Sequence, residues 1–238
     1  QALSPANKGF EFKGLRKARQ SDKTEWKFIK DIFTGKPLSM DEYSLFAGTS
    51  WFFVDPRMNQ TLDYLFIDEA GQVALATTIA MATASKNLVL IGDQMQLSQP
   101  IRAKHVGYAR KSSLDFILED NDTIAPEKGI FLNTTRRLNE NLCHFVSDSF
   151  YDSRLTSHEI TKTRSVKLNL EPIKNEGLFY VPIEHTGCSQ RSDEEANLVE
   201  KTYNKIIGKE YKISDNKGKI SPKDIMVVAP YNAQANNI

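Results

Sequence analysis

Short apolar runs alternate with amphipathic stretches through the middle of the chain. The run at 45–54 is typical of a strand and its exit, and compact apolar runs at 64–68 and 87–93 each end in a carboxylate. Residues 73–84 and 112–118 have the spacing of helices. Strands that alternate with helices predict an α/β fold with a parallel sheet of the doubly wound type.

The alternation restarts after a turn-rich stretch at 121–129, which we take as a domain boundary. Helices are predicted beyond it at 140–151 and 193–208. The second of these begins with acidic residues and ends with basic ones, which is the charge order that the helix dipole favours. Three apolar runs there are predicted to be strands, at 129–133, 177–183 and 224–230.

The N-terminal segment is the most polar part of the chain, with nine Lys or Arg against six Asp or Glu in residues 1–42. We expect a short helix there whose apolar face is formed by Trp26, Phe28, Ile29, Ile32 and Phe33. Its charged face is more typical of a solvated surface than of a nucleic-acid arm. The predicted organisation is a polar peripheral segment at 1–42, a partial α/β domain at 43–125 and a second at 126–238.

Composition narrows the class of protein. The 238 residues are 40% hydrophobic and 26% charged, as in soluble globular proteins, and the net charge of +1 requires any nucleic-acid contact to come from local patches. The two cysteines form no CxxC pair, so zinc and thiol-redox sites are not indicated and free thiols are expected. Without a long apolar run or a secretory signal, we expect a cytoplasmic protein with no membrane partner.

Two neighbouring carboxylates end the predicted strand in the sequence YLFIDEAGQ. Ligands of open parallel sheets bind at such strand ends. Asp68 and Glu69 point in different directions there, so one can hold Mg²⁺ while the other orients and deprotonates an attacking water. Gly71 permits a tight exit, and Gln72 offers an amide to a phosphate oxygen. Taken alone, the pair fits a helix N-cap equally well.

A second polar strand end follows one helix and one strand later, in the sequence GDQMQLSQP at 92–100. This spacing lets both loops line the same crevice, where Asp93 and Gln96 would sense the state of a nucleotide. A polar turn that caps a buried strand explains Gly-Asp alone. It does not explain Gln, Leu and Pro at these places after the first motif.

The succession D-E-A-G-Q and G-D-x-x-Q-L-x-x-P resembles motifs II and III of superfamily 1 helicases, in the branch of the nonsense-mediated-decay helicase and its bacterial relatives, some of which are fused to RecB-like nucleases. The resemblance implies two partial motor domains of RecA-like (P-loop NTPase) type that use ATP and Mg²⁺. It implies that Asp68 positions Mg²⁺ and that Glu69 is the general base for ATP hydrolysis. Asp93 would lie at the nucleotide, and Gln72 and Gln96 would couple the γ-phosphate to the nucleic-acid track.

Segments on either side of these motifs fit the same family. Thr49 and Ser50 match a turn that contacts the nucleic-acid backbone, so the implied partner is a single strand, with DNA favoured over RNA. Trp51 is able to stack on a base, although a Trp at a strand exit is more often part of the core. Near the C-terminus, Tyr231 and Gln234 match a Pro-Tyr-x-x-Gln motif that supports the second motor domain or its track.

An arginine motif opens the second half of the resemblance. The segment 131–155 is similar to the family's first motif in the second motor domain, and the alignment places the family arginine at Arg137. Its guanidinium would stabilise charge on the transferred phosphoryl group. Arg136 replaces the usual aromatic residue and Glu140 the usual Pro, so which arginine reaches the nucleotide stays open. An arginine pair that binds local carboxylates is the alternative.

A phosphate-cradling loop is missing from the sequence. The segment FTGKPLS at 33–39 contains Gly35-Lys36, but Pro37 follows and no Gly stands five positions earlier. The later family motifs are also absent, and the chain begins without Met and stops after 231–238, which suggests a fragment.

We therefore expect part of an ATP-dependent helicase or translocase that is inactive as a fragment. The alternative is a degenerate helicase-like module that binds partners or nucleic acid without ATP turnover. Another P-loop ATPase or a metal nuclease fits the motifs less well. Asp68, Glu69, Gln96 and Arg137 are predicted to face one crevice between two RecA-like halves.

Overall fold

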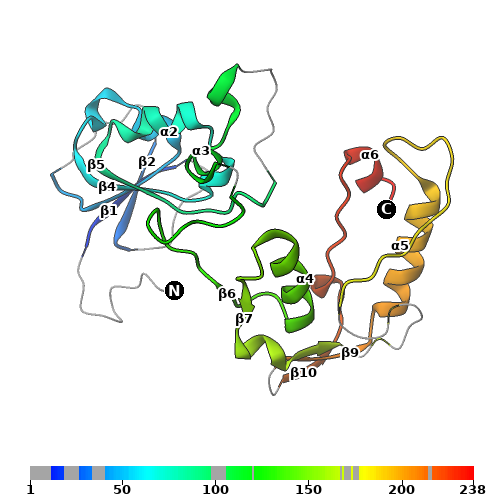
Figure 1. Cartoon of the computed structure of the whole chain (residues 1–238). Coiled ribbons are helices and arrows are strands. Elements are labelled where there is room, and N and C mark those ends of the chain that lie inside the picture. The colour runs from blue at the N-terminus through cyan, green and yellow to red at the C-terminus, as the bar shows by residue number, and fades with distance from the viewer. Residues whose placement is uncertain are drawn as a thin grey trace. The chain divides into compact units, whose positions relative to one another are not determined.

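The computed structural model describes two compact units, Gln1–Asn121 and Asp122–Ile238. Its described residues are 12–18, 27–33, 41–97, 106–119, 121–166, 168, 173, 177–213 and 216–238. Each unit combines helices with a parallel strand pair (Figure 1), which confirms the predicted α/β class with parallel sheets.

The first sheet of the N-terminal unit has three parallel strands in the order β2-β1-β3. They are β1 (Gly14–Lys17), β2 (Ile29–Ile32) and β3 (Leu45–Ala47). The helix expected around residues 28–33 is therefore wrong. A short apolar run does not by itself distinguish a helix face from a strand, and pairing with β1 decides the outcome here.

The second sheet is the parallel pair β4 (Leu62–Ile67) and β5 (Ser85–Leu90). Helix α2 (Leu75–Ala82) makes the crossover between the strands, as parallel pairing requires. Leu65 and Ile67 of β4 are buried, whereas the alternate side chains on the other face are exposed. Helix α3 (Ser113–Leu118) follows, and the short helix α1 (Ser50–Phe53) precedes β4.

The C-terminal unit contains the two helices expected from the sequence, α4 (Glu140–Phe150) and α5 (Asp193–Ile206). Its strands form a short parallel pair, β6 with β7, and an antiparallel sheet in the order β10-β9-β8. The strands are β6 (Thr134–Thr135), β7 (Thr156–Ser157), β8 (Arg164–Val166), β9 (Glu210–Ile213) and β10 (Asn216–Lys219). The last helix is α6 (Asn232–Ala235).

Short 3₁₀ turns connect these elements. They are η2 (Pro56–Met58), η3 (Ala70–Gln72), η4 (Gly107–Arg110), η5 (Glu159–Thr163) and η6 (Pro222–Asp224). No helix among the described residues has the length and apolar character that crossing a membrane requires.

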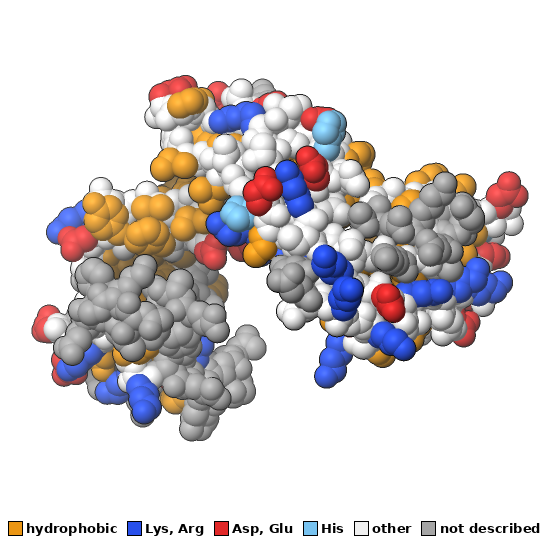
Figure 2. Space-filling view, turned by 90° about the horizontal axis from the view of Figure 1, so that it is seen from below, with side chains coloured by type: hydrophobic (Ala, Val, Ile, Leu, Met, Phe, Trp, Pro, Cys, Tyr) orange, Lys and Arg blue, Asp and Glu red, His pale blue; other side chains and the backbone are white. Residues whose placement is uncertain are grey.

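Three runs expected to be strands in the C-terminal unit are not strands. Residues 129–133, 177–183 and 224–230 take part in no β-ladder with any described residue, and Asp224 belongs to the 3₁₀ turn η6. Their apolar side chains are largely exposed, as with Leu178 at 63% and Val228 at 80%. Apolar side chains, drawn in orange, are visible on the face of the molecule that Figure 2 shows.

Candidate nucleotide site at the ends of two parallel strands

The ends of β4 and β5 lie side by side. Ile67 is paired with Leu90, and the backbone N–H of Ile91 donates to the carbonyl of Ile67 at 2.8 Å. One step further, the N–H of Ala70 donates to the carbonyl of Ile91 at 2.9 Å. The structure therefore brings the segment that begins at Asp68 against the segment that follows β5.

Two glycines let these segments touch through their backbones. A Cβ atom on Gly71 would overlap the carbonyl oxygen of Asp93, and one on Gly92 would lie 2.7 Å from the backbone nitrogen of Ala70. Both contacts are with backbone atoms, which cannot turn aside as a flexible side chain can. Close approach of the two backbones is the reason for glycine at both positions. The tight turn that the sequence led us to expect at Gly71 is made at Glu69 instead.

Glu69 makes the sharp turn after β4. Its φ of +54° lies in the left-handed region, which costs a residue with a Cβ about 1–2 kcal/mol. The backbone N–H of Glu69 donates to Oδ1 of Asp68 at 3.0 Å, and both carboxylates are exposed. A strained backbone at an acidic pair is typical of functional sites, where surrounding contacts hold the strain.

The second loop presents Asp93 and Gln96. Oδ1 of Asp93 accepts the backbone N–H of Met95 at 3.0 Å, and its Oδ2 accepts from Nε2 of Gln96 at 3.0 Å. The Gln96 side chain is exposed and held by this bond. Gln72, in η3 of the first loop, is also exposed. The two loops that meet at this strand edge thus carry five of the predicted groups, Asp68, Glu69, Gln72, Asp93 and Gln96. Residues 98–100 of the second motif lie outside the described residues.

Ser113 ties helix α3 to the turn after β4. Its Oγ donates to the carbonyl of Ala70 at 3.1 Å, its backbone N–H donates to the carbonyl of Val73 at 3.1 Å, and its side chain is buried. Ser112 and Asp115 form a capping box at the same helix start. Sequence reasoning missed Ser113, because the S-S-L-D pattern signals only a helix N-terminus.

The acidic pair fits a magnesium ion that shares its ligands with a nucleotide. No three His, Cys, Asp or Glu side chains gather into a metal site among the described residues. Mg²⁺ prefers oxygen ligands and usually keeps several waters beside one or two carboxylates and substrate phosphates. The exposed Asp68 is suited to such a shared site, because within the described part of the chain its Oδ1 accepts a hydrogen bond only from the neighbouring Glu69 N–H. Residues 34–39, from the Gly35-Lys36 segment that lacks the pattern of a phosphate loop, lie outside the described residues.

The predicted track residues lie at the start of α1. Thr49 is the N-cap residue, but its side chain makes no capping hydrogen bond, and it is exposed. Ser50 is half-buried. Trp51 is 79% exposed, so the preference for a core position is wrong. The neighbouring Phe52 and Phe53 fill the core position instead.

Arg137 belongs to the C-terminal unit, in the loop between β6 and α4. Its backbone N–H donates to Oγ1 of Thr135 at 3.2 Å, and its carbonyl accepts from Arg164 at 2.9 Å. The side chains of Arg136 and Arg137 are both exposed. The loop is held by its backbone, and a shared crevice with Asp68 stays a prediction.

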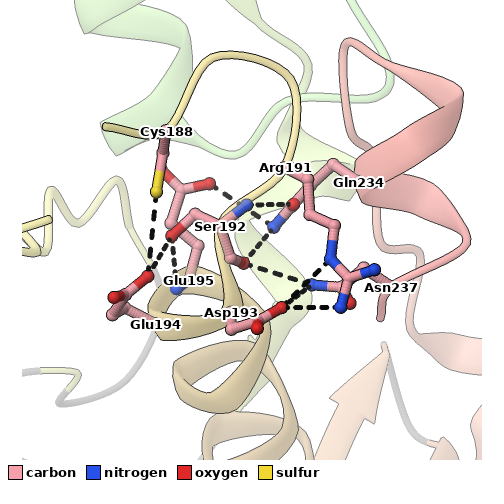
Figure 3. Close-up of polar contacts among 8 residues, drawn as sticks. All are labelled: Cys188, Arg191, Ser192, Asp193, Glu194, Glu195, Gln234 and Asn237. Carbon is pink, nitrogen blue, oxygen red and sulfur yellow. Dashed lines mark hydrogen bonds and ion pairs between the residues drawn. The ribbon is translucent and has the colours of Figure 1, made fainter. Parts of the chain in front are cut away.

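Gln234 holds the N-terminus of α5 (Figure 3). The buried amide accepts the Ser192 N–H at 2.7 Å and donates to the Ser192 carbonyl at 3.0 Å. Asn237 donates to Oδ1 of Asp193 at 3.0 Å, and Arg191 donates to the same oxygen. These hydrogen bonds lower the pKa of Asp193, with those from Arg191 the main cause. The C-terminal motif therefore supports a helix start.

Comparison with known proteins assigns the family. One family model, described as an AAA domain, matches residues 110–238, which is more than half of the chain. The chain belongs to the AAA domain family. A second AAA domain model matches residues 41–101 of this AAA chain, the stretch that contains both strand ends. No solved structure matches it.

Two curated relatives carry the same name. The DNA polymerase alpha-associated DNA helicase A of Schizosaccharomyces pombe is 29% identical over 187 residues, which cover 74% of this AAA chain and 27% of the relative. The protein of the same name from Saccharomyces cerevisiae is 27% identical over 252 aligned positions, which cover 96% of this AAA chain and 36% of the relative. The chain thus spans about a quarter to a third of the length of these relatives. They support the helicase part of the resemblance.

Proposed function

We propose that this AAA chain is part of the ATP-hydrolysing motor of a superfamily 1 DNA helicase. One observation carries the proposal: the carboxylates that end β4 stand against the Asp93–Gln96 loop that ends β5, held by the Ala70–Ile91 hydrogen bond. Parallel sheets place ligands at such an edge. Two exposed carboxylates there suit a metal-bound triphosphate better than a structural cap, because neither caps α2.

The proposed roles follow from the chemistry of each group. ATP with Mg²⁺ supplies the transferable phosphoryl group. Asp68 would hold the metal, and Glu69 would take the proton of the attacking water. Gln72 and Gln96, with Asp93, would read the γ-phosphate.

Arg137 would bring positive charge to the nucleotide from the second domain. Its guanidinium is suited to bidentate contact with a phosphate. Its exposed side chain on a backbone-anchored loop is free to make such a contact.

The track and the parent protein are proposed from the relatives. Both are named as DNA helicases, which favours single-stranded DNA as the partner, with Thr49 and Ser50 at its backbone. Membership of the bacterial branch, a fused or associated RecB-like nuclease and a cytoplasmic location stay predictions. The sequence contains no GxxxxGK[ST] loop, so we expect residues 1–238 alone not to turn over ATP.

The proposed residue roles are tested by measuring DNA-stimulated ATP hydrolysis. The protein for this assay is a longer one that contains both this chain and a GxxxxGK[ST] phosphate-binding loop. Glu69→Gln should lower kcat by about 10²–10⁴-fold, the usual contribution of a positioned general base, and leave Mg-ATP binding intact. The exposed Glu42→Gln in the same unit is the matched control and should retain full activity. Equal kcat for Glu69→Gln and wild type would remove the motor assignment.

The inactivity of the fragment needs its own measurement. Purified residues 1–238 should show no magnesium-dependent ATP hydrolysis above background. Robust hydrolysis that Glu69→Gln abolishes would overturn the claim that the fragment is inactive, while leaving the motor assignment in place.

A further inference from the structure

Helix α1 holds one large aromatic side chain out of the core. Phe52 and Phe53 are 2% and 8% exposed, whereas Trp51 on the same short helix is 79% exposed. The two phenylalanines fix the helix, with their ring centroids 5.1 Å apart. A single exposed apolar side chain is ordinary on a protein surface. The surroundings of Trp51 distinguish it.

The corner that carries Trp51 is closely packed. A Cβ on Gly48 would lie 2.8 Å from Cδ1 of Phe52, so the ring of Phe52 packs directly on the backbone before the helix. The N–H of Phe52 also donates to the carbonyl of Thr49 at 2.9 Å. The indole is therefore presented from a fixed turn, beside a Thr hydroxyl that makes no capping bond.

The charge around this corner is positive. Nζ of Lys17 lies 5.7 Å from the ring centroid of Phe52, so an ammonium group stands beside α1. Asp55, which follows α1, is engaged by Arg57, with Oδ1 2.9 Å from Nε and Oδ2 2.6 Å from a terminal guanidinium nitrogen. This pairing, mainly through the side-chain hydrogen bonds, lowers the pKa of Asp55. Among these three groups Arg57 balances Asp55 and Lys17 leaves one positive charge, which favours an anionic partner.

An exposed indole and a hydroxyl at the start of α1, with an ammonium group against the neighbouring Phe52 ring, match the parts of a single-stranded nucleic acid. We propose that Trp51 is a stacking platform for a base, while Thr49 and Lys17 contact the adjoining phosphates. Stacking is sequence-tolerant because every base has a π-face, so the site is suited to a strand that moves past it. This proposal rests on the proposed function and adds to it a base-binding residue.

The chain provides its own probe. Its two tryptophans are Trp26 and Trp51, so Trp26→Phe leaves Trp51 as the sole indole fluorophore. Oligothymidylate of about 12 nucleotides, within the usual range of single-strand site sizes, is titrated into the full chain. Trp51 emission should be quenched at saturation, whereas an abasic oligonucleotide of equal length should bind with little quenching.

Substitution measures the contribution of stacking. In fluorescence anisotropy with a labelled oligothymidylate, Trp51→Ala should raise Kd about tenfold, and Trp51→Phe should recover most of the affinity. The matched control is Tyr64→Ala, which removes another exposed aromatic of the same unit, 59% exposed, and should leave Kd unchanged. Circular dichroism of each variant verifies that it is folded. With abasic DNA, wild type and Trp51→Ala should bind alike.

Three results would overturn the proposal. They are no binding of oligothymidylate by the chain, unchanged affinity on Trp51→Ala, and equal quenching by abasic DNA. If affinity is unchanged but Trp51→Ala alters the sedimentation of the protein, the indole contacts a second copy of the chain. The motor assignment is judged separately, because the Glu69→Gln comparison of kcat does not depend on Trp51.

Discussion

Apolar runs of similar composition form paired strands in the N-terminal unit but not in the C-terminal unit. In the N-terminal unit, 62–67 and 85–90 form a parallel ladder whose end carries the candidate nucleotide site. In the C-terminal unit, 177–183 and 225–229 are equally apolar but pair with no described residue. The difference shows that an apolar run is not sufficient to form a strand. The run also needs a neighbouring strand with which its backbone can pair.

The physical reason is the hydrogen bonding of the backbone. Each N–H and C=O that leaves water needs a partner, and in a sheet that partner is the neighbouring strand. Helix α2 returns the chain so that β5 meets β4, and the interior then covers Leu65 and Ile67. Without a ladder, 177–183 and 225–229 keep most of their apolar side chains in water.

The largest expected effect comes from the backbone contact that joins the two site loops. Gly71→Ala should destabilise the N-terminal unit by about 3 kcal/mol, because the new methyl group overlaps the Asp93 carbonyl and the backbone must move. Urea unfolding followed by circular dichroism measures the loss. Gly107→Ala is the control. Gly107 has a φ of +62° but open space around it, so only the left-handed backbone is penalised there, at about 1 kcal/mol. Equal losses for the two variants would contradict the close contact.

The C-terminal unit should respond most to the amide that holds α5. Gln234→Ala removes both hydrogen bonds to the backbone of Ser192 in a buried place, at a cost of about 1–3 kcal/mol. The first turn of α5 should then exchange its amides faster, as measured by hydrogen exchange with mass spectrometry. Asn232→Ala, at an exposed position of α6, is the matched control. Unchanged protection of α5 in Gln234→Ala would show that the contact is dispensable.

A smaller effect of opposite sign is expected at Glu69. Glu69→Gly relieves the left-handed backbone but increases the freedom of the unfolded chain, so it should stabilise by about 0.5 kcal/mol. Glu69→Ala keeps a Cβ and should not stabilise. Thermal unfolding of the two variants separates backbone strain from loss of the carboxylate. A Tm for Glu69→Gly below that of Glu69→Ala would contradict the strain.

The smallest effect is the acid sensitivity of the α5 start. The pKa of Asp193 is lowered from 3.8 when folded, so its stabilising contribution is present above the unfolded pKa and is lost as pH falls through the folded value. Between about pH 5 and 3, wild type should therefore lose more stability than Asp193→Asn. The urea concentration at the midpoint of unfolding, measured for both proteins across this pH range, tests this expectation. Midpoints that fall in parallel with pH for wild type and Asp193→Asn would contradict it.

The site loops could be predicted from the sequence because they follow local rules. A compact apolar run ending in Asp68, then a helix and a second run ending in Asp93, fixes a parallel pair with both ends at one edge. The contacts of Ser113 and the exposure of Trp51 could not be predicted, since both depend on what packs nearby. The predictions for 29–32 and for the three apolar runs of the C-terminal unit were wrong for the same reason. Strand pairing is decided by residues that are distant in the sequence.

Amide hydrogen exchange of the whole chain tests the central claim most directly, because it compares both units in one sample. We expect slow exchange for the amides of β5 and for Ala70, whose N–H is held by the Ile91 carbonyl, and fast exchange across 177–183 and 225–229. If Ala70 and the strand ends exchange as fast as those runs, Asp68 and Glu69 do not stand on a built strand edge, and the nucleotide site proposed there is lost.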